Sequence, residues 1–300
     1  MKRIIAISAF WCVAFSSVGC INPDVLIQAH QIMENAPTAS QVQTADAITE
    51  KETSKQETVT VDELVKRMDF FRNNCYYDFS IQFGYESLYD NVSYGELETR
   101  MTISHIKYDN IVFSDTTTAM IHRINRHENI EEKKIKEYNV FNDDGTMYYI
   151  VWNTGDDEWE VQKESQDSLQ ISENDNYVTY DEKHFKDAYI EEKDEYYIIK
   201  NVAENAYVRE FAEGFVLCDY EECPKKIKIT TSVYFEKSTK EIKEIVAEID
   251  YSLLNEYHLD TNMHDEYDGI YSKYLPAKVV VNNIKERTKE IPLPTGVELK

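Results

Sequence analysis

The feature that most constrains the fold is a strict alternation of apolar and other side chains between Tyr77 and Tyr85. Successive side chains of a β-strand point to opposite faces, so this period predicts a strand with one buried and one solvated face. Strands of this kind are typical of antiparallel sheets. The buried positions would be Tyr77, Phe79, Ile81, Phe83 and Tyr85.

A short amphipathic helix is predicted just before this strand. Thr60-Val61-Asp62-Glu63 matches a capping box, in which the threonine hydroxyl and the glutamate carboxylate satisfy free amides of the first turn. Apolar residues then recur at steps of three and four: Leu64, Val65, Met68, Phe71 and Cys75. We expect a helix from Val61 to about Asn74 whose apolar stripe covers the sheet.

The strands that follow are predicted from the same alternation and from turn residues. They are Leu97–Tyr108, Ile111–Arg123, Lys134–Phe141, Met147–Trp152 and Glu158–Lys163. Asn142-Asp143-Asp144-Gly145 is a strong hairpin signal between two of them. Because consecutive strands joined by short turns pair with each other, this half of the chain predicts a meander of at least five or six strands.

The second half of the chain is predicted to mix strands with helices. We expect a loop at Ser165–Asn176, short strands at Tyr177–Tyr180 and Tyr196–Lys200, and helices at Asp181–Glu192 and within Val202–Leu217. Further strands are expected at Lys225–Phe235, Glu241–Leu253 and Ala277–Ile284, with an acidic loop at Asn255–Tyr271 and a tail marked by Pro292 and Pro294. The prediction is a single β-rich domain over residues 60–300; two similar halves that split near Ser165 are the alternative.

The first twenty residues have the order of a secretory leader. Lys2 and Arg3 precede an uncharged apolar run, Ile4–Phe15, and small or β-branched residues lead to Gly19. The run is shorter than the ~20 apolar residues that span a bilayer, so residues 1–19 are predicted to be a signal peptide. Ser17-Val18-Gly19-Cys20 resembles the bacterial lipoprotein signal, which implies a diacylglyceryl group on Cys20 after cleavage. Ser17 departs from the leucine usual at its position, so secretion without lipid is the alternative.

The segment after Cys20 is predicted to be a flexible tether, residues 20–59. It has no aromatic residue and is rich in Gln, Thr, Ala, Ser and Glu. Such a composition buries too little apolar surface to offset the entropy lost on ordering. The tether would join the domain to the lipid on Cys20. Because the two acyl chains of a diacylglyceryl group suffice for stable attachment, we expect the domain to be lipid-anchored on the extracytoplasmic face of the cell membrane.

The charge of the chain excludes several partners. Loss of Lys2 and Arg3 with the signal peptide takes the net charge from −24 to −26. Such a surface is repelled by phosphates, which disfavours nucleic acid and direct adsorption of the folded domain to anionic lipid. The 22 tyrosines and 12 phenylalanines nevertheless suffice for a core.

Motifs for chemistry are lacking in the sequence. It contains no G-x-S-x-G elbow, and eight glycines form neither a phosphate loop nor a dinucleotide fingerprint. We predict no enzyme activity, no catalytic residue, no cofactor and no metal. The segment from His258 to Asp268 is interpreted as a solvated acidic loop rather than a cation site, and His122 and His127 as strand-face residues. Cys218 and Cys223 either form a disulfide or remain two thiols, and the sequence leaves both alternatives open. Cys75 is the third cysteine of the domain and would then have no cysteine partner within it.

The order of signal, acceptor Cys20, polar tether, capped helix, meander and the closing hairpin Tyr234–Ile242 resembles Gram-positive lipoproteins with a LolA-like fold. The resemblance implies an α+β fold in which a strongly curved antiparallel sheet, an incomplete barrel, packs on a few helices. It also implies a concave apolar cavity that holds an acyl chain or another hydrophobic molecule. The predicted function is thus a non-enzymatic binding lipoprotein. The alternative is a cell-surface or envelope protein that binds a protein or glycan through a tyrosine-rich sheet face.

Overall fold

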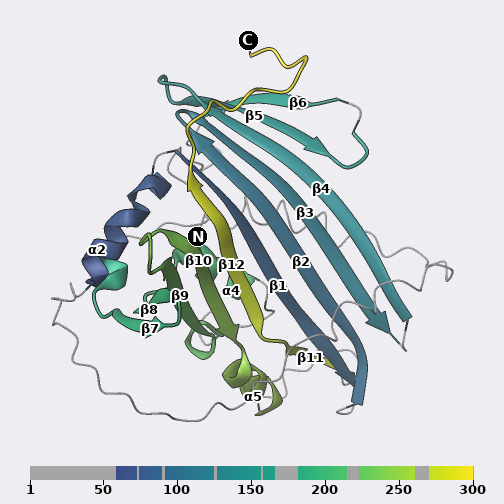
Figure 1. The fold of residues 1–300 in the computed structure, drawn as a ribbon. Coiled ribbons are helices and arrows are strands. Elements are labelled where there is room, and N and C mark those ends of the chain that lie inside the picture. Colours follow the sequence, from purple (N-terminus) through teal and green to yellow (C-terminus); the bar gives the residue numbers. More distant parts are fainter. Residues whose placement is uncertain are drawn as a thin grey trace, which may run out of the picture.

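The computed structural model describes residues 59–72, 74–89, 92–124, 127–156, 158–165, 182–214, 216, 223–260 and 270–299 (Figure 1). These residues form one 12-stranded sheet in the order β6-β5-β4-β3-β2-β1-β12-β10-β9-β8-β7, with β11 paired to β1 beside that path. Every strand pair is antiparallel. The prediction of a curved, unclosed antiparallel sheet with a few helices is confirmed.

The elements have the following bounds. The strands are β1 (Cys75–Tyr89), β2 (Val92–Tyr108), β3 (Ile111–Ile124), β4 (His127–Phe141), β5 (Thr146–Asn153), β6 (Glu160–Ser165), β7 (Tyr189–Lys193), β8 (Tyr196–Val202), β9 (Lys228–Glu236), β10 (Ile242–Asp250), β11 (Ile270–Tyr274) and β12 (Ala277–Glu286). The α-helices are α2 (Val61–Val65), α4 (Ala206–Gly214) and α5 (Ser252–Asp260), and the 3₁₀ helices are η1 (Lys66–Arg72), η2 (Glu182–Phe185) and η3 (Cys223–Lys226).

Strands β1 to β6 form the predicted meander, each paired with the next along the chain. The four long strands β1 to β4 run side by side across the molecule in Figure 1. The turn between β4 and β5 needs a glycine, because Gly145 has a φ of 79° and its N–H donates to the Asn142 carbonyl at 3.2 Å. The alternation from Tyr77 onward therefore predicted this wing of the sheet correctly.

Strand β12 joins the meander to the rest of the sheet. It lies between β1 and β10, and it pairs Phe79 with Val281 on one side and Val281 with Ile245 on the other. Strands β10, β9, β8 and β7 then follow in order. The predicted strands at Lys225–Phe235 and Ala277–Ile284 are observed as β9 and β12 with small shifts of their ends.

The helix before β1 begins as predicted but changes its type. The Thr60 hydroxyl accepts a hydrogen bond from the Glu63 N–H at 3.2 Å, which is the expected N-cap. The α-helix ends at Val65, however, and continues as the 3₁₀ helix η1 to Arg72. Because of this change, the α-helix predicted to Asn74 is wrong beyond Val65, although Leu64, Met68 and Phe71 are buried as expected. The Glu63 carboxylate, expected to cap the first turn, instead pairs with Lys240 at 2.5 Å.

Two predictions in the second half are wrong. The helix expected at Asp181–Glu192 is η2 followed by β7, because the residues after Ala188 pair with β8 across a turn in which Asp194 has a φ of 43°. The loop expected from Asn255 begins instead inside α5, whose first turn is capped by the Asp250 carboxylate bound to the Ser252 N–H at 2.9 Å. Strand β11 was not predicted, and Tyr177–Tyr180 lies outside the described residues.

The main core lies between the helices and one face of the sheet, which we call the inner face. Side chains of α2, η1, α4 and α5 pack there against inward-pointing residues of β1, β2, β8, β9, β10 and β12. Tyr77, Phe79, Val233 and Phe235 are among the fully buried residues. Of the residues that the structure describes, none from β3 to β6 belongs to this core. No described helix has the length and apolar character needed to cross a bilayer.

The C-terminal tail packs on the opposite, outer face. It follows β12 and crosses the sheet near β5 and β6 (Figure 1). Leu293, Val297 and Leu299 contact a buried cluster on β4 and β5 that consists of Val140, Tyr148 and Ile150. The tail therefore shields this cluster on the outer face of β4 and β5 from solvent.

Candidate functional site

The candidate site lies on the inner face of the meander, beyond the helix-covered core. The strand register places Tyr77, His105, Ser114, Glu137 and Val151 in one row across β1 to β5. The next row contains Cys75, Lys107, Val112, Asn139 and Tyr149. Neighbouring strands are ~4.8 Å apart, so each residue in a row lies beside the next. We call His105, Lys107, Ser114, Glu137, Asn139 and Tyr149 the inner-face polar group.

The half of this group on β2 and β3 is deeply buried. His105 is 2 % exposed, Lys107 4 % and Ser114 6 %. The His105 ring stacks on Tyr77 with centroids 4.7 Å apart, and its Nδ1 lies 3.4 Å from the Ser114 hydroxyl. The neighbouring Cys75 is a buried free thiol, and burial raises its pKa to about 12. Cys75 is therefore protonated and unreactive at neutral pH.

The half on β4 and β5 is rich in hydrogen-bond acceptors and only half-buried. The Tyr149 hydroxyl donates to the Glu137 carboxylate at 2.5 Å. Burial raises the pKa of Glu137, and this hydrogen bond opposes the rise. The Oδ1 atom of Asn139 is buried and accepts no hydrogen bond from any residue that the structure describes. This half therefore concentrates oxygen acceptors on the inner face, one of them without a donor from the described residues.

The order of groups across the strands bears on what they can do chemically. A nucleophilic triad needs the imidazole between the serine and the carboxylate, so that the carboxylate orients the base. Here Ser114 lies between His105 and Glu137. The Glu137 carboxylate is thus two strands away from the imidazole and does not orient it. The arrangement offers hydrogen bonds and charge, which are the means of binding a polar group.

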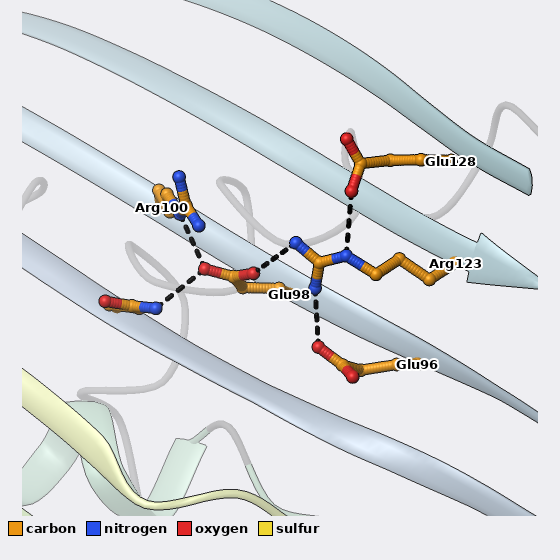
Figure 2. A network of polar contacts seen from close by, with 6 residues as sticks. Glu96, Glu98, Arg100, Arg123 and Glu128 are labelled. Atoms are coloured by element: carbon orange, nitrogen blue, oxygen red, sulfur yellow. Dashed lines mark hydrogen bonds and ion pairs between the residues drawn. The ribbon is translucent and has the colours of Figure 1, made fainter. Parts of the chain in front are cut away.

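A second polar cluster lies on the outer face and has a different character (Figure 2). Arg123 on β3 contacts three carboxylates: Glu96 at 2.5 Å, Glu98 at 2.8 Å and Glu128 at 2.8 Å. Glu98 also accepts from Arg100 at 2.5 Å and from Gln82 at 2.7 Å. Although it points outward, Glu98 is only 6 % exposed. We call Gln82, Glu96, Glu98, Arg100, Arg123 and Glu128 the arginine network.

The arginine network links four strands, three of them by ion pairs and β1 by the hydrogen bond from Gln82. Its members come from β1, β2, β3 and β4. Burial disfavours the charged form of Glu98, but hydrogen bonds from Arg100 and Arg123 outweigh that effect and lower the pKa of Glu98. Each oxygen of Glu98 already has a cationic partner. The network is therefore a structural clamp rather than an open binding site.

The sequence-predicted site residues fall in different parts of the chain. Cys20 and the residues from Thr261 to Gly269 lie outside the described residues, as does Cys218. His258 lies in α5, and His122 and His127 lie in β3 and β4 as the predicted strand residues. Within the described part of the chain, no three His, Cys, Asp or Glu side chains are placed to hold a metal ion.

Sequence reasoning missed the inner-face polar group. A signal for it exists, since His105 and Lys107 continue the inward phase of Met101 and Ile103 on β2. Glu137 and Asn139 share the phase of the buried Phe141 on β4. Polar residues at inward positions of a strand are informative because buried polar groups require partners. Which of them meet across strands depends on register, which spacing alone does not give.

Comparison of the chain with known proteins identifies no relative that bears on this site. No protein-family model matches the chain, and no curated protein matches its sequence. The inner face of β2 to β5 is therefore the basis on which a function can be proposed.

Proposed function

We propose that the chain is a non-enzymatic lipoprotein that binds a hydrophobic or lipid-like molecule on the inner face of its sheet. In this proposal residues 1–19 are a signal peptide, and a diacylglyceryl group on Cys20 anchors the protein to the extracytoplasmic face of the cell membrane. Residues 20–59 are the tether, and residues 60–300 form a domain with a LolA-like incomplete barrel.

One observation supports ligand binding above the others. The helix-covered core ends at β2, whereas the inner face of the sheet continues through β3 to β6. Half-buried apolar residues there, such as Met120 and Ile135, alternate along and across the strands with polar ones. A face of mixed character suits a molecule with an apolar chain and a polar end, because ligand sites combine apolar lining with a few polar groups.

The anchor is tested by native mass spectrometry of the mature protein after gentle extraction from membranes. We expect a chain that begins at Cys20 and carries a diacylglyceryl mass, and we expect the Cys20→Ser variant to lose both the lipid and membrane association. Cys12→Ser is the matched control, because Cys12 would be removed with the signal peptide. Recovery of the wild-type chain from the cytosol with residues 1–19 attached would refute this part of the proposal.

The ligand site is tested by placing a charge on the inner face. Ile135→Asp puts a carboxylate among the half-buried inner-face residues of β4, and we expect at least a tenfold loss of co-purified apolar ligand. Thr117→Asp is the control, because Thr117 points to the outer face of β3. Equal loading of the two variants would exclude the inner face as the binding surface.

A second function is favoured by tyrosines on the outer face of the other wing. Tyr189 on β7 is 58 % exposed and Tyr196 on β8 is 40 % exposed. Tyr196 packs edge-on against Tyr234 of β9, with centroids 6.2 Å apart. This tyrosine patch suits a cell-surface protein that binds a protein or glycan. Loss of cell-surface binding in a Tyr189→Ser/Tyr196→Ser variant that keeps its apolar ligand would favour this function over the first.

A further inference from the structure

We propose that Glu137, Asn139 and Tyr149 form the polar end of the ligand site, and that the ligand is an amphiphile whose neutral head group carries several hydroxyl groups. This inference rests on the proposed binding of a lipid-like molecule. It adds the position and the chemical class of the head group.

The position follows from Asn139. A buried acceptor without a donor is rare in native proteins, because it loses its hydrogen bonds to water on folding. The Asn139 Oδ1 atom is buried and accepts no hydrogen bond from the described residues. Its inner-face neighbours are Val112 on β3 and Tyr149 on β5. A donor supplied by a ligand on the inner face would satisfy this oxygen.

The acceptors around Asn139 indicate a donor-bearing head group. Glu137 lies two residues away on the same face of β4, and its carboxylate has one oxygen bound to the Tyr149 hydroxyl. Both side chains are half-buried, whereas His105 and Lys107 are almost completely buried. A ligand that meets Asn139 and Glu137 therefore meets two acceptors side by side.

The charge on the inner face disfavours an anionic head group. Such a head group would lie against the Glu137 carboxylate and would be repelled. Hydroxyl groups donate to both acceptors and carry no charge.

The test compares four probes that share a twelve-carbon chain and differ in the polar end. Binding of 1-monolauroylglycerol, methyl laurate, laurate and dodecylamine to the full mature chain is measured by calorimetry at pH 7, below their micelle concentrations. We expect 1-monolauroylglycerol to bind about tenfold more tightly than methyl laurate, the gain that one or two net hydrogen bonds give. Laurate and dodecylamine should bind more weakly than 1-monolauroylglycerol.

Asn139→Leu should remove this preference. Leucine has a similar volume and no acceptor, so the ratio of the two dissociation constants should fall to about one, while the affinity for methyl laurate stays unchanged. Asn129→Leu is the matched control: Asn129 lies on the same face of β4, ten positions away, opposite His122. It should keep the preference. The melting temperature of Asn139→Leu should equal or exceed that of the wild type, because the variant loses an unsatisfied polar atom.

The outcomes separate the two levels of the proposal. If Asn139→Leu keeps the wild-type ratio, or if laurate or dodecylamine is the preferred probe, the head-group inference is wrong. If methyl laurate binds as tightly as 1-monolauroylglycerol to the wild type, apolar ligand binding stands and the head-group site fails. If none of the four probes binds, the proposed function fails, and the inference fails with it.

Discussion

Removal of Arg123 should weaken the outer face of the sheet, because this residue pairs with three carboxylates. Arg123→Leu would leave Glu98, which is 6 % exposed, with less of the positive charge that balances it. We expect a loss of about 2 kcal/mol in the free energy of unfolding, below the full cost of breaking a buried pair because Arg123 itself is one-third exposed. Urea unfolding would measure this loss.

The control for this change is an exposed ion pair on the same face. Lys134 and Glu132 are 3.3 Å apart on β4, and both side chains are more than half exposed. Lys134→Met should therefore change the free energy of unfolding by less than about 0.5 kcal/mol. Equal effects of the two substitutions would show that the arginine network contributes no more than an ordinary surface pair.

Replacement of Glu137 by a neutral residue should make the protein more stable at neutral pH. Burial raises the pKa of Glu137 above its usual 4.5, so the folded chain holds this proton more tightly than the unfolded chain. Stability associated with the protonated form is then lost as the pH rises from about 4.5 through the raised pKa. Glu137→Gln should unfold at higher urea concentration than the wild type at pH 7, and the difference should vanish below about pH 4.5.

Glu98 should show the opposite dependence on pH. Its pKa is lowered in the folded chain, so its contribution to stability is present above about pH 4.5 and is lost as the pH falls through the lowered value. Glu98→Gln should therefore be less stable than the wild type at pH 7 and should approach it in acid. A pair of curves with the same sign for the two variants would contradict the assigned environments of both carboxyl groups.

The residues that form the candidate site were the least predictable part of the molecule. His105 and Glu137 lie more than thirty positions apart and meet only through Ser114 on the strand between them. Alternation predicts that each points inward or outward, but it does not say which residue of the next strand lies opposite. A one-residue change of register would move Glu137 to the outer face.

Among the elements, β1 and β2 leave no room for a side chain at Gly84. A Cβ atom at this position would lie 2.5 Å from the Leu97 carbonyl oxygen and 3.3 Å from the Glu98 Cα atom, both on the backbone of β2. Gly84→Ala should therefore force the two strands apart and reduce the free energy of unfolding by about 2 kcal/mol. Gly214→Ala, at the end of α4, is the control, because a Cβ atom there meets nothing within 4 Å. Chemical denaturation of both variants would test the contact.

The strands that were predicted correctly are those whose alternation is visible in the sequence itself. Strands β1 to β6 pair only with their neighbours in the chain or with β11 and β12, and the turn between β4 and β5 carries a hairpin signal of its own. The segment Asp181–Glu192 was wrongly predicted as a helix because the pairing of β7 with β8 in a hairpin overrides a weak helical preference. The position of β12 between β1 and β10 has no local signal, since its partners come from opposite ends of the domain.

At the scale of the whole molecule, β12 is the strand that makes one sheet out of two. A chain that ends at Pro276 would lack it, and β1 and β10 would each have an open edge instead. We expect this variant to be degraded rapidly by added protease, because strand edges and the inner core would be exposed. A chain that ends at Glu286 is the control: it keeps β12 and loses only the tail, so it should resist protease but bind a hydrophobic dye at the uncovered Tyr148 and Ile150.

The place of β12 also sets the timing of folding during biosynthesis. The Ser80 hydroxyl on β1 donates to the Val280 carbonyl on β12, two groups 200 positions apart in the chain. Because synthesis proceeds from the amino terminus, β1 cannot pair with β12 until nearly the entire polypeptide has been made. During that interval the apolar side chains and one edge of β1 are exposed to solvent. The edge of β1 that β12 covers therefore stays open to other strands until the last part of the domain has been delivered.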